Sequence, residues 1–242
     1  MKRVLGLLPE ALICVAKSEA ADYSEVVPAA QLLFHDDLPA LVPIRNWLNR
    51  TIQEDCVVQV DDDLKAVWFL IGKKRRTTDP AVIREIIENT HRVAADLNIS
   101  VFCWSRSANQ FVLRPWLNPI RFATPISCSF GLRGRARQRR FDPGCPGRED
   151  FDFSMQTLLE DRILYADARF YFDHGRIFSG LGGNAGLITD GQFASATERL
   201  KQKWGRFLSM DKPGFQKGKA NNVPAMSVRV RRHNPAVMAN WR

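Results

Sequence analysis

Three consecutive aspartates are the residues of this sequence best suited to do chemistry. Asp61, Asp62 and Asp63 directly follow the apolar run Cys56–Val60, which predicts a buried strand, and a second strand-like run covers residues 66–71. Three carboxylates at the end of a buried strand repel one another, and such a cluster usually needs a cation. Carboxylate oxygens suit Mg²⁺ or Mn²⁺, and a metal held there would bind phosphates. An acidic turn or a helix cap is the alternative interpretation.

A second group of acids opens a predicted helix. The segment from Arg148 to Ser154 contains Glu149, Asp150 and Asp152. One of these carboxylates can act as a general base that takes the proton from an acceptor hydroxyl. Acids in the first turn of a helix are also ordinary capping residues that complement the helix dipole, so both interpretations stay open.

Arg45, His174 and a run of glycines add weaker signals. Arg45 lies with Asn46 on a helix predicted over residues 39–55, where its planar guanidinium could bind a diphosphate. A surface arginine beside a core tryptophan is the simpler interpretation. We expect His174 to be a surface histidine rather than a metal ligand. The glycines of residues 180–186 predict a loop that approaches a ligand closely, although their spacing matches neither a phosphate-binding loop nor a Rossmann fingerprint.

Alternating strands and helices must position these groups. The apolar run 11–16 predicts a strand buried on both faces, which favours a parallel sheet covered by helices. Asp79 and Pro80 are the expected N-cap and first residue of a long amphipathic helix, and residues 99–104 predict the next strand. The order predicts an α/β fold: a single domain over residues 1–210, with a mixed, mainly parallel sheet flanked by helices.

The net charge of +9 is concentrated at the carboxyl end of the chain. Residues 201–242 hold ten basic residues and one acid, so residues 1–200 are neutral overall. The basic extension, residues 211–242, suits a polyanion such as DNA or RNA, although it can also serve only solubility. Five arginines between Arg133 and Arg140 form a second basic segment.

Composition excludes several classes of protein. With 45% hydrophobic and 25% charged residues, the chain is neither disordered nor fibrous, and no apolar run is long enough to span a membrane. Five widely spaced cysteines without a C-x-x-C pair predict buried thiols in a reducing compartment and no zinc site. Pro9 and Glu10 interrupt the apolar stretch at the amino terminus, which argues against a signal peptide.

Taken in order, these motifs resemble those of the GT-A fold glycosyltransferases, which use nucleotide-sugar donors. More narrowly, they resemble the TET/base-J-associated DNA glycosyltransferases, the phage DNA hypermodification type. The resemblance covers residues 10–190, and only the ordered combination of motifs is specific. The segments that carry it are residues 16–23, Arg45-Asn46-Trp47, the aspartate triplet, residues 148–154, Asp167-Ala168-Arg169 and Gly182-Gly183-Asn184.

The resemblance implies a GT-A-like (Rossmann-like) fold and the transfer of a sugar from a nucleotide-sugar, a UDP-sugar, to DNA. The implied acceptor is the hydroxyl of 5-hydroxymethylcytosine or 5-hydroxymethyluracil. The implied cofactor is Mn²⁺ or Mg²⁺, held by Asp61 and Asp63. The other implied roles are donor contacts by Glu19, Arg45, Asn46, Asp61 and Asp62, and catalysis by Asp150 as the base, with Asp152 and Glu149 as the other candidates.

DNA would then be held by the basic extension and by the loop from Arg133 to Arg140. We expect a monomer in the cytoplasm of a bacterial or phage-infected cell, with no membrane partner. Two other functions stay open. One is a glycosyltransferase that acts on a protein, a lipid or a small glycan. The other is a nucleic-acid-binding protein without catalytic activity, whose aspartates are structural.

Overall fold

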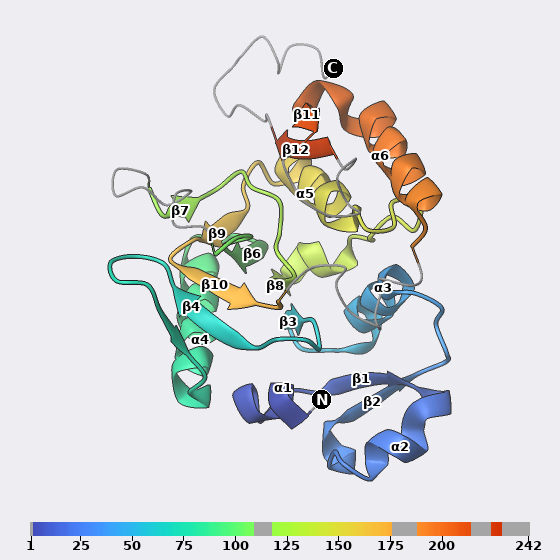
Figure 1. Ribbon diagram of the computed structural model, residues 1–242, viewed down its shortest axis with the longest axis vertical. Coiled ribbons are helices and arrows are strands. Elements are labelled where there is room, and N and C mark those ends of the chain that lie inside the picture. Colours follow the sequence, from blue (N-terminus) through green and yellow to red (C-terminus); the bar gives the residue numbers. More distant parts are fainter. Residues whose placement is uncertain (1, 109–117, 176–187, 214–223, 229–242) are drawn as a thin grey trace.

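A computed structural model describes residues 2–108, 118–175, 188–213 and 224–228 (Figure 1). Residues 209–213 and 224–228 are described by their backbone only. The described α-helices are α1 (Lys2–Leu7), α2 (Ala20–Ser24), α3 (Leu41–Thr51), α4 (Pro80–Asp96), α5 (Glu149–Glu160) and α6 (Asp190–Trp204). The described strands are β1 (Ile13–Ala16), β2 (Leu32–His35), β3 (Cys56–Val60), β4 (Ala66–Phe69), β5 (Arg75–Thr77), β6 (Val101–Trp104), β7 (Ile120–Arg121), β8 (Ser129–Arg133), β9 (Tyr165–Asp167), β10 (Phe170–Asp173), β11 (Leu208–Pro213) and β12 (Pro224–Val228).

The strands form one larger sheet and three small ones. The larger sheet has the order β3-β8-β6-β9-β7, and a three-stranded sheet has the order β10-β4-β5. β1 and β2 form a pair at one end of the molecule beside α1 and α2, whereas β11, β12 and α6 lie at the opposite end (Figure 1). β11 crosses residue 210, the domain boundary expected from the sequence. The fold is therefore mixed α/β, as predicted.

The expectation of a mainly parallel sheet is wrong for the described strands. The pairs β1–β2 and β6–β9 are parallel, and the other six described pairs are antiparallel. The apolar runs indicated strands buried on both faces, and β6 is indeed buried at all four residues. An antiparallel strand in the middle of a sheet with helices on both sides is buried in the same way, so burial could not reveal strand direction.

Helices cover both faces of the larger sheet. Successive residues of a strand point to opposite faces. Phe102 and Trp104 of β6 pack with the apolar side of α4, whereas Val101 and Cys103 pack in a second core cluster with apolar residues of α5. The α4 helix begins as predicted, because the Asp79 side chain accepts a hydrogen bond from the backbone N–H of Ala81 and Pro80 follows it. Each face of the sheet thus has its own apolar core.

One edge of this sheet collects the ends of several strands. β3 and β6 are both antiparallel to β8, so they run in the same direction, and β9 is parallel to β6. The carboxyl ends of β3, β6 and β9 therefore meet the amino end of β8 at one edge. Asp61 follows β3, Arg106 lies just beyond β6, and Cys128 precedes β8. The topology thus brings charged residues from distant parts of the sequence together.

Two further sequence expectations concern the thiols and the membrane. All five cysteines are free; Cys103 and Cys145 are buried and the other three are half-buried. Among the described residues, no helix combines the length and apolar character needed to cross a membrane.

Candidate functional site

Arg45 joins the aspartate triplet to the acids of α5. Its guanidinium lies 3.2 Å from Asp61 Oδ1 and 3.2 Å from Glu149 Oε1. The group is buried, and it stands over the rings of Phe130 and Phe141 at 5.2 and 5.6 Å. Burial alone would lower the pKa of Arg45, but Asp61 and Glu149 outweigh it and raise the pKa, so the guanidinium stays charged. Arg45 is therefore an internal cation and not a surface residue.

Glu149 is the more deeply buried partner of Arg45. Burial raises the pKa of Glu149, and the charge of Arg45 opposes that rise. Only one carboxylate oxygen contacts Arg45; the other, Oε2, is buried and has no hydrogen-bond partner among the described residues. A buried acceptor without a partner carries a desolvation cost. Glu149 thus keeps one unsatisfied acceptor in the interior beside Arg45.

Asp150 lies at the same edge, paired with a different cation. Arg106 Nη1 is 2.7 Å from Asp150 Oδ2 and also donates to the carbonyl of Ile126 at 2.7 Å. The Asp150 side chain keeps 23% of its surface exposed, so solvent or a ligand can reach it. A half-exposed carboxylate held by an arginine has the access that a general base needs.

The thiol of Cys128 lies within electrostatic range of both acid–arginine pairs. Burial raises the pKa of Cys128 to about 12, and Asp61, Arg45, Asp150 and Arg106 each act on it electrostatically. The two acids and the two arginines therefore all lie within electrostatic range of this thiol. A thiol with so high a pKa stays protonated near neutral pH and is a poor nucleophile.

Asp63 is held by His174. His174 Nδ1 lies 2.8 Å from Asp63 Oδ1, and its Nε2 lies 2.7 Å from the hydroxyl oxygen of Ser129. His174 is buried, so the expectation of a surface histidine is wrong: β10 pairs with β4 and carries the ring inward against the start of β8. The Asp63 side chain remains 55% exposed. One of its oxygens is thus oriented by the ring while the side chain still reaches solvent.

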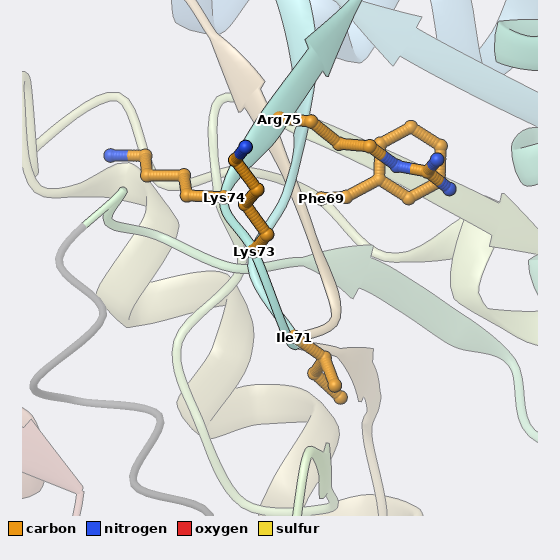
Figure 2. Close-up of a pocket in the computed structure, with 5 residues that line it drawn as sticks. All are labelled: Phe69, Ile71, Lys73, Lys74 and Arg75. Carbon is orange, nitrogen blue, oxygen red and sulfur yellow. The ribbon is translucent and has the colours of Figure 1, made fainter.

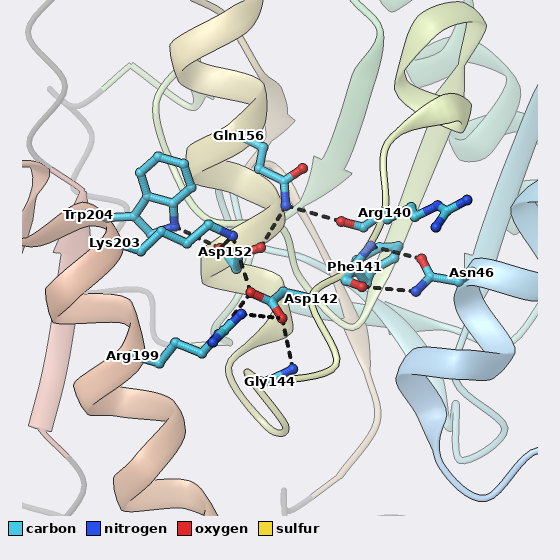
Figure 3. A network of polar contacts seen from close by, with 10 residues as sticks. All are labelled: Asn46, Arg140, Phe141, Asp142, Gly144, Asp152, Gln156, Arg199, Lys203 and Trp204. Carbon is cyan, nitrogen blue, oxygen red and sulfur yellow. Dashed lines mark hydrogen bonds and ion pairs between the residues drawn. The ribbon is translucent and has the colours of Figure 1, made fainter.

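The remaining donor-side candidates lie in two places. Glu19 and Asp62 are exposed, and both act electrostatically on Tyr23, whose pKa is raised by burial first and by these two acids second. They therefore face the β1–β2 side of the triplet. Asn46 instead binds the backbone of Phe141, donating to its carbonyl at 2.9 Å and accepting from its N–H at 2.8 Å (Figure 3). Its amide positions the segment that packs on Arg45.

Asp152 lies apart from the aspartate triplet. Its carboxylate is fully buried and contacts Lys203 Nζ at 2.6 Å, Trp204 Nε1 at 2.7 Å and Gln156 Nε2 at 2.6 Å (Figure 3). Two residues along a helix correspond to about 200° of rotation, so Asp150 and Asp152 point to nearly opposite sides of α5. The structure therefore separates the two candidate bases and directs Asp152 toward α6.

Within the described part of the chain, one group of three metal-ligating side chains lies close together: Asp142, Cys145 and Asp152. Lys203 contacts both carboxylates, and Arg199 contacts Asp142 at 3.0 Å. Burial raises the pKa of Cys145 to about 12, which opposes formation of the thiolate that a metal binds. Because cations of the protein already neutralise the acids, these residues do not fit a metal ion.

We expect Asp152→Ala to lower the free energy of unfolding by about 2–3 kcal/mol, because it removes the acceptor of Trp204 and one of the two acceptors of both Lys203 and Gln156. Urea denaturation measures this loss. Asp96→Ala, which removes an exposed carboxylate at the end of α4, is the control and should change stability by less than about 0.5 kcal/mol. Equal stability of the two variants would show that Asp152 does not tie α5 to α6.

Most arginines of the loop from Arg133 to Arg140 serve the fold. Arg135 pairs with Asp161 at 3.0 Å, and Arg139 contacts Glu160 at 2.7 Å. Arg137 donates to backbone carbonyls at the end of α3, one of them that of Asn49 at 3.0 Å. Three of the five arginines are thus committed to internal partners, which weakens the expectation that this loop holds DNA. The basic extension lies almost wholly outside the described residues.

Two of the hollows on the described surface lie away from the aspartate triplet. One, of about 350 Å³, is at the turn between β4 and β5 (Figure 2). The other, of about 570 Å³, lies beside Asn46 and is lined in part by Arg50, Arg140 and Lys203. The glycines of residues 180–186, which the sequence placed near a ligand, lie outside the described residues.

Comparison of the chain with protein-family models, with curated proteins and with solved structures found no match. Function is therefore inferred from the residues that meet at the sheet edge.

Proposed function

We propose that this protein is a metal-dependent glycosyltransferase of GT-A-like fold. It would transfer a sugar from a nucleotide-sugar, a UDP-sugar, to the hydroxyl of 5-hydroxymethylcytosine or 5-hydroxymethyluracil in DNA. One observation carries the proposal: Arg45 bridges Asp61 and Glu149 at the edge where Asp150 and Asp63 also keep exposed carboxylate surface. This arrangement would supply carboxylates for a metal, a cation and a base at one edge of the sheet.

In this proposal Asp61 and Asp63 would hold Mg²⁺ or Mn²⁺ together with a diphosphate. Mg²⁺ commonly binds through one or two carboxylates plus phosphate oxygens and water. Asp61 and Asp63 have side chains 33% and 55% exposed, so both can offer oxygens. His174 already orients Asp63. When bound, the metal would stabilise the negative charge that develops on the leaving diphosphate.

The remaining chemistry falls to residues of the chain. The oxygen of the acceptor hydroxyl forms a bond to the anomeric carbon as the bond from that carbon to the diphosphate oxygen breaks. Asp150 takes the hydroxyl proton, and the nucleoside diphosphate leaves with the bonding electrons. Arg106 holds Asp150 in place, and Arg45 fixes Asp61 and Glu149 relative to each other.

The nature of the donor and acceptor can be tested together. Mn²⁺ with a UDP-sugar should raise the melting temperature, because a ligand that binds only the folded state stabilises it. A labelled donor pool should then transfer label to DNA that contains either hydroxymethylated base. Absence of a shift with every nucleotide-sugar would contradict the enzyme proposal. Transfer to a glycan or protein but to neither base would contradict the DNA acceptor.

Asp63→Ala should weaken Mn²⁺-dependent binding of the donor by at least about 100-fold, because it removes one of two carboxylate ligands. Isothermal titration calorimetry with a UDP-sugar measures this. The fold should survive, since the side chain is mostly exposed. Asp55→Ala, at the opposite end of β3, removes an equal charge and should leave the affinity unchanged. Unchanged affinity in Asp63→Ala would exclude Asp63 as a ligand.

A further inference from the structure

We propose that the turn of the β4–β5 hairpin, with Lys73, Lys74, Arg75 and Arg76, binds the phosphate backbone of a nucleic acid. This basic hairpin turn is separate from the extension and from the loop of residues 133–140. The proposal deepens the proposed function, because it assigns the acceptor a surface beside the same site. Binding itself does not depend on sugar transfer.

The cations of the basic hairpin turn have no acidic partner among the described residues. Residues 64–78 contain five basic residues and no acid. Within the part of the chain that the structure describes, no acid forms an ion pair with Lys73, Lys74, Arg75 or Arg76, and all four are exposed. Arginines 135, 137 and 139 behave differently, because the fold itself uses them. Unpaired, exposed cations without interspersed acids are the electrostatic footprint of a polyanion site.

Aromatic rings hold two of these cations in place. The guanidinium of Arg75 lies over the Phe69 ring at 4.5 Å, as Figure 2 shows. Lys74 Nζ lies over the Trp68 ring at 4.7 Å and donates to the carbonyl of Ala108 at 3.0 Å. These contacts already restrict the two long side chains, so each loses less conformational entropy when it binds an anion.

The surface beside these cations is hollowed. Phe69, Ile71, Lys73, Lys74 and Arg75 line a hollow of about 350 Å³ (Figure 2). Ile71 is 54% exposed. Apolar side chains in the lining can contact a sugar or a base while the cations contact phosphates, and sites for single-stranded nucleic acid likewise combine cations with stacking rings.

The hairpin also lies in the right place relative to the candidate site. β4 begins three residues after Asp63, and its partner β10 ends beside His174, which holds Asp63. The open end of the hairpin, its base, therefore lies beside Asp63, and its turn lies farther from the candidate site. At about 3.3 Å per strand residue, Lys73 lies on the order of 20 Å from the base of the hairpin. In B-form DNA one strand carries a phosphate for each 3.4 Å or so of helix axis, so that distance corresponds to about six nucleotides of a stacked strand.

A nucleic acid fits this surface better than a membrane does. Surface-bound membrane segments are typically amphipathic helices with a broad apolar face. The basic hairpin turn offers a β-hairpin and a single large exposed apolar side chain, Ile71. Phosphates at regular spacing along a strand match a row of cations, and binding releases the counterions that the phosphates had condensed.

The triple variant Lys73→Gln, Arg75→Gln, Arg76→Gln tests the proposal in the full chain. Fluorescence anisotropy with unmodified DNA oligonucleotides of 4, 12 and 24 nucleotides, titrated at several KCl concentrations, measures affinity and its salt dependence. We expect the variant to bind the 12-mer and 24-mer about tenfold or more weakly, with a salt slope reduced by about two to three. In the wild type, the 4-mer should bind more weakly than the 12-mer.

Arg3→Gln, Arg92→Gln, Arg162→Gln is the matched control, because it removes three exposed positive charges elsewhere. Equal weakening by both triple variants would overturn the proposal, since any loss of charge would then suffice. So would wild-type affinity in the hairpin variant, or a loss of binding to phosphatidylserine vesicles without a loss of DNA binding.

Calorimetry with Mn²⁺ and a UDP-sugar separates the two proposals: donor binding that persists in the hairpin variant shows that the site is intact. DNA binding by a wild-type protein that transfers no sugar would contradict only the proposed function.

Discussion

Replacing Asp150 with asparagine should reduce sugar transfer by about 10²–10⁴-fold while metal-dependent binding of the nucleotide-sugar is retained. Asparagine keeps the shape of the side chain but cannot accept the proton of the acceptor hydroxyl. Asp150 is the acid in the first turn of α5 that keeps exposed surface, and it directly follows Glu149, which Arg45 joins to Asp61. Single-turnover transfer to hydroxymethylated DNA, with calorimetry for the donor, measures the two effects separately.

Asp152→Asn is the matched comparison two residues away. The carboxylate of Asp152 contacts Lys203 and Trp204, not the groups at the sheet edge. We therefore expect this variant to lose stability, and to transfer sugar at near the wild-type rate at temperatures where it is folded. Normal transfer by Asp150→Asn together with loss of transfer in folded Asp152→Asn would exchange the roles of the two residues.

Replacing Arg45 with methionine should lower the free energy of unfolding at neutral pH by about 3–5 kcal/mol. The substitution keeps much of the apolar volume over Phe130 and Phe141, so the loss comes mainly from electrostatics. It leaves the buried carboxylate of Glu149 without the one cation that contacts it among the described residues. Thermal or urea denaturation at pH 7 measures the effect, and donor affinity should fall as well, because Asp61 loses the group that orients it.

The defect of Arg45→Met should shrink as the pH falls. Burial already raises the folded-state pKa of Glu149, and removal of Arg45 raises it further. When the folded-state pKa of a carboxyl group lies above its unfolded-state pKa, the folded state loses stability as the pH rises from the unfolded-state pKa through the folded-state pKa. Protonation below this window removes the buried charge. The double variant Arg45→Met, Glu149→Gln should recover part of the stability at pH 7, and a defect independent of pH would contradict the role of Glu149.

Much of the secondary structure could be predicted from the sequence, because it depends on neighbours in the chain. Asp79 and Pro80 start α4 where the cap rules placed them, and the apolar run Cys56–Val60 forms β3. Strand direction could not be predicted in this way. β8 is buried at four of its five residues, yet it runs antiparallel to both β3 and β6. Burial on two faces selects apolar residues whatever the direction of the strand.

The roles of basic and polar side chains were the least predictable part. Five arginines in one segment suggested a DNA contact, but their partners lie far along the chain, and three of them brace the fold. By contrast, the four basic residues of the short β4–β5 hairpin have no acidic partner among the described residues. Whether a cation is available to a ligand depends on which acids the fold brings near it.

The sequence by itself determined that an aspartate triplet follows a buried strand and that a helix opens with three acids, since both facts are local. Only the tertiary structure decided which partner each of these acids contacts. Glu149 pairs with Arg45, 104 residues away, Asp150 pairs with Arg106, and Asp152 turns toward Lys203. His174 is brought to Asp63 across 111 residues. The physical reason is that each pairing depends on the direction of a strand and the rotation of a helix against its neighbours, and packing of distant segments sets both.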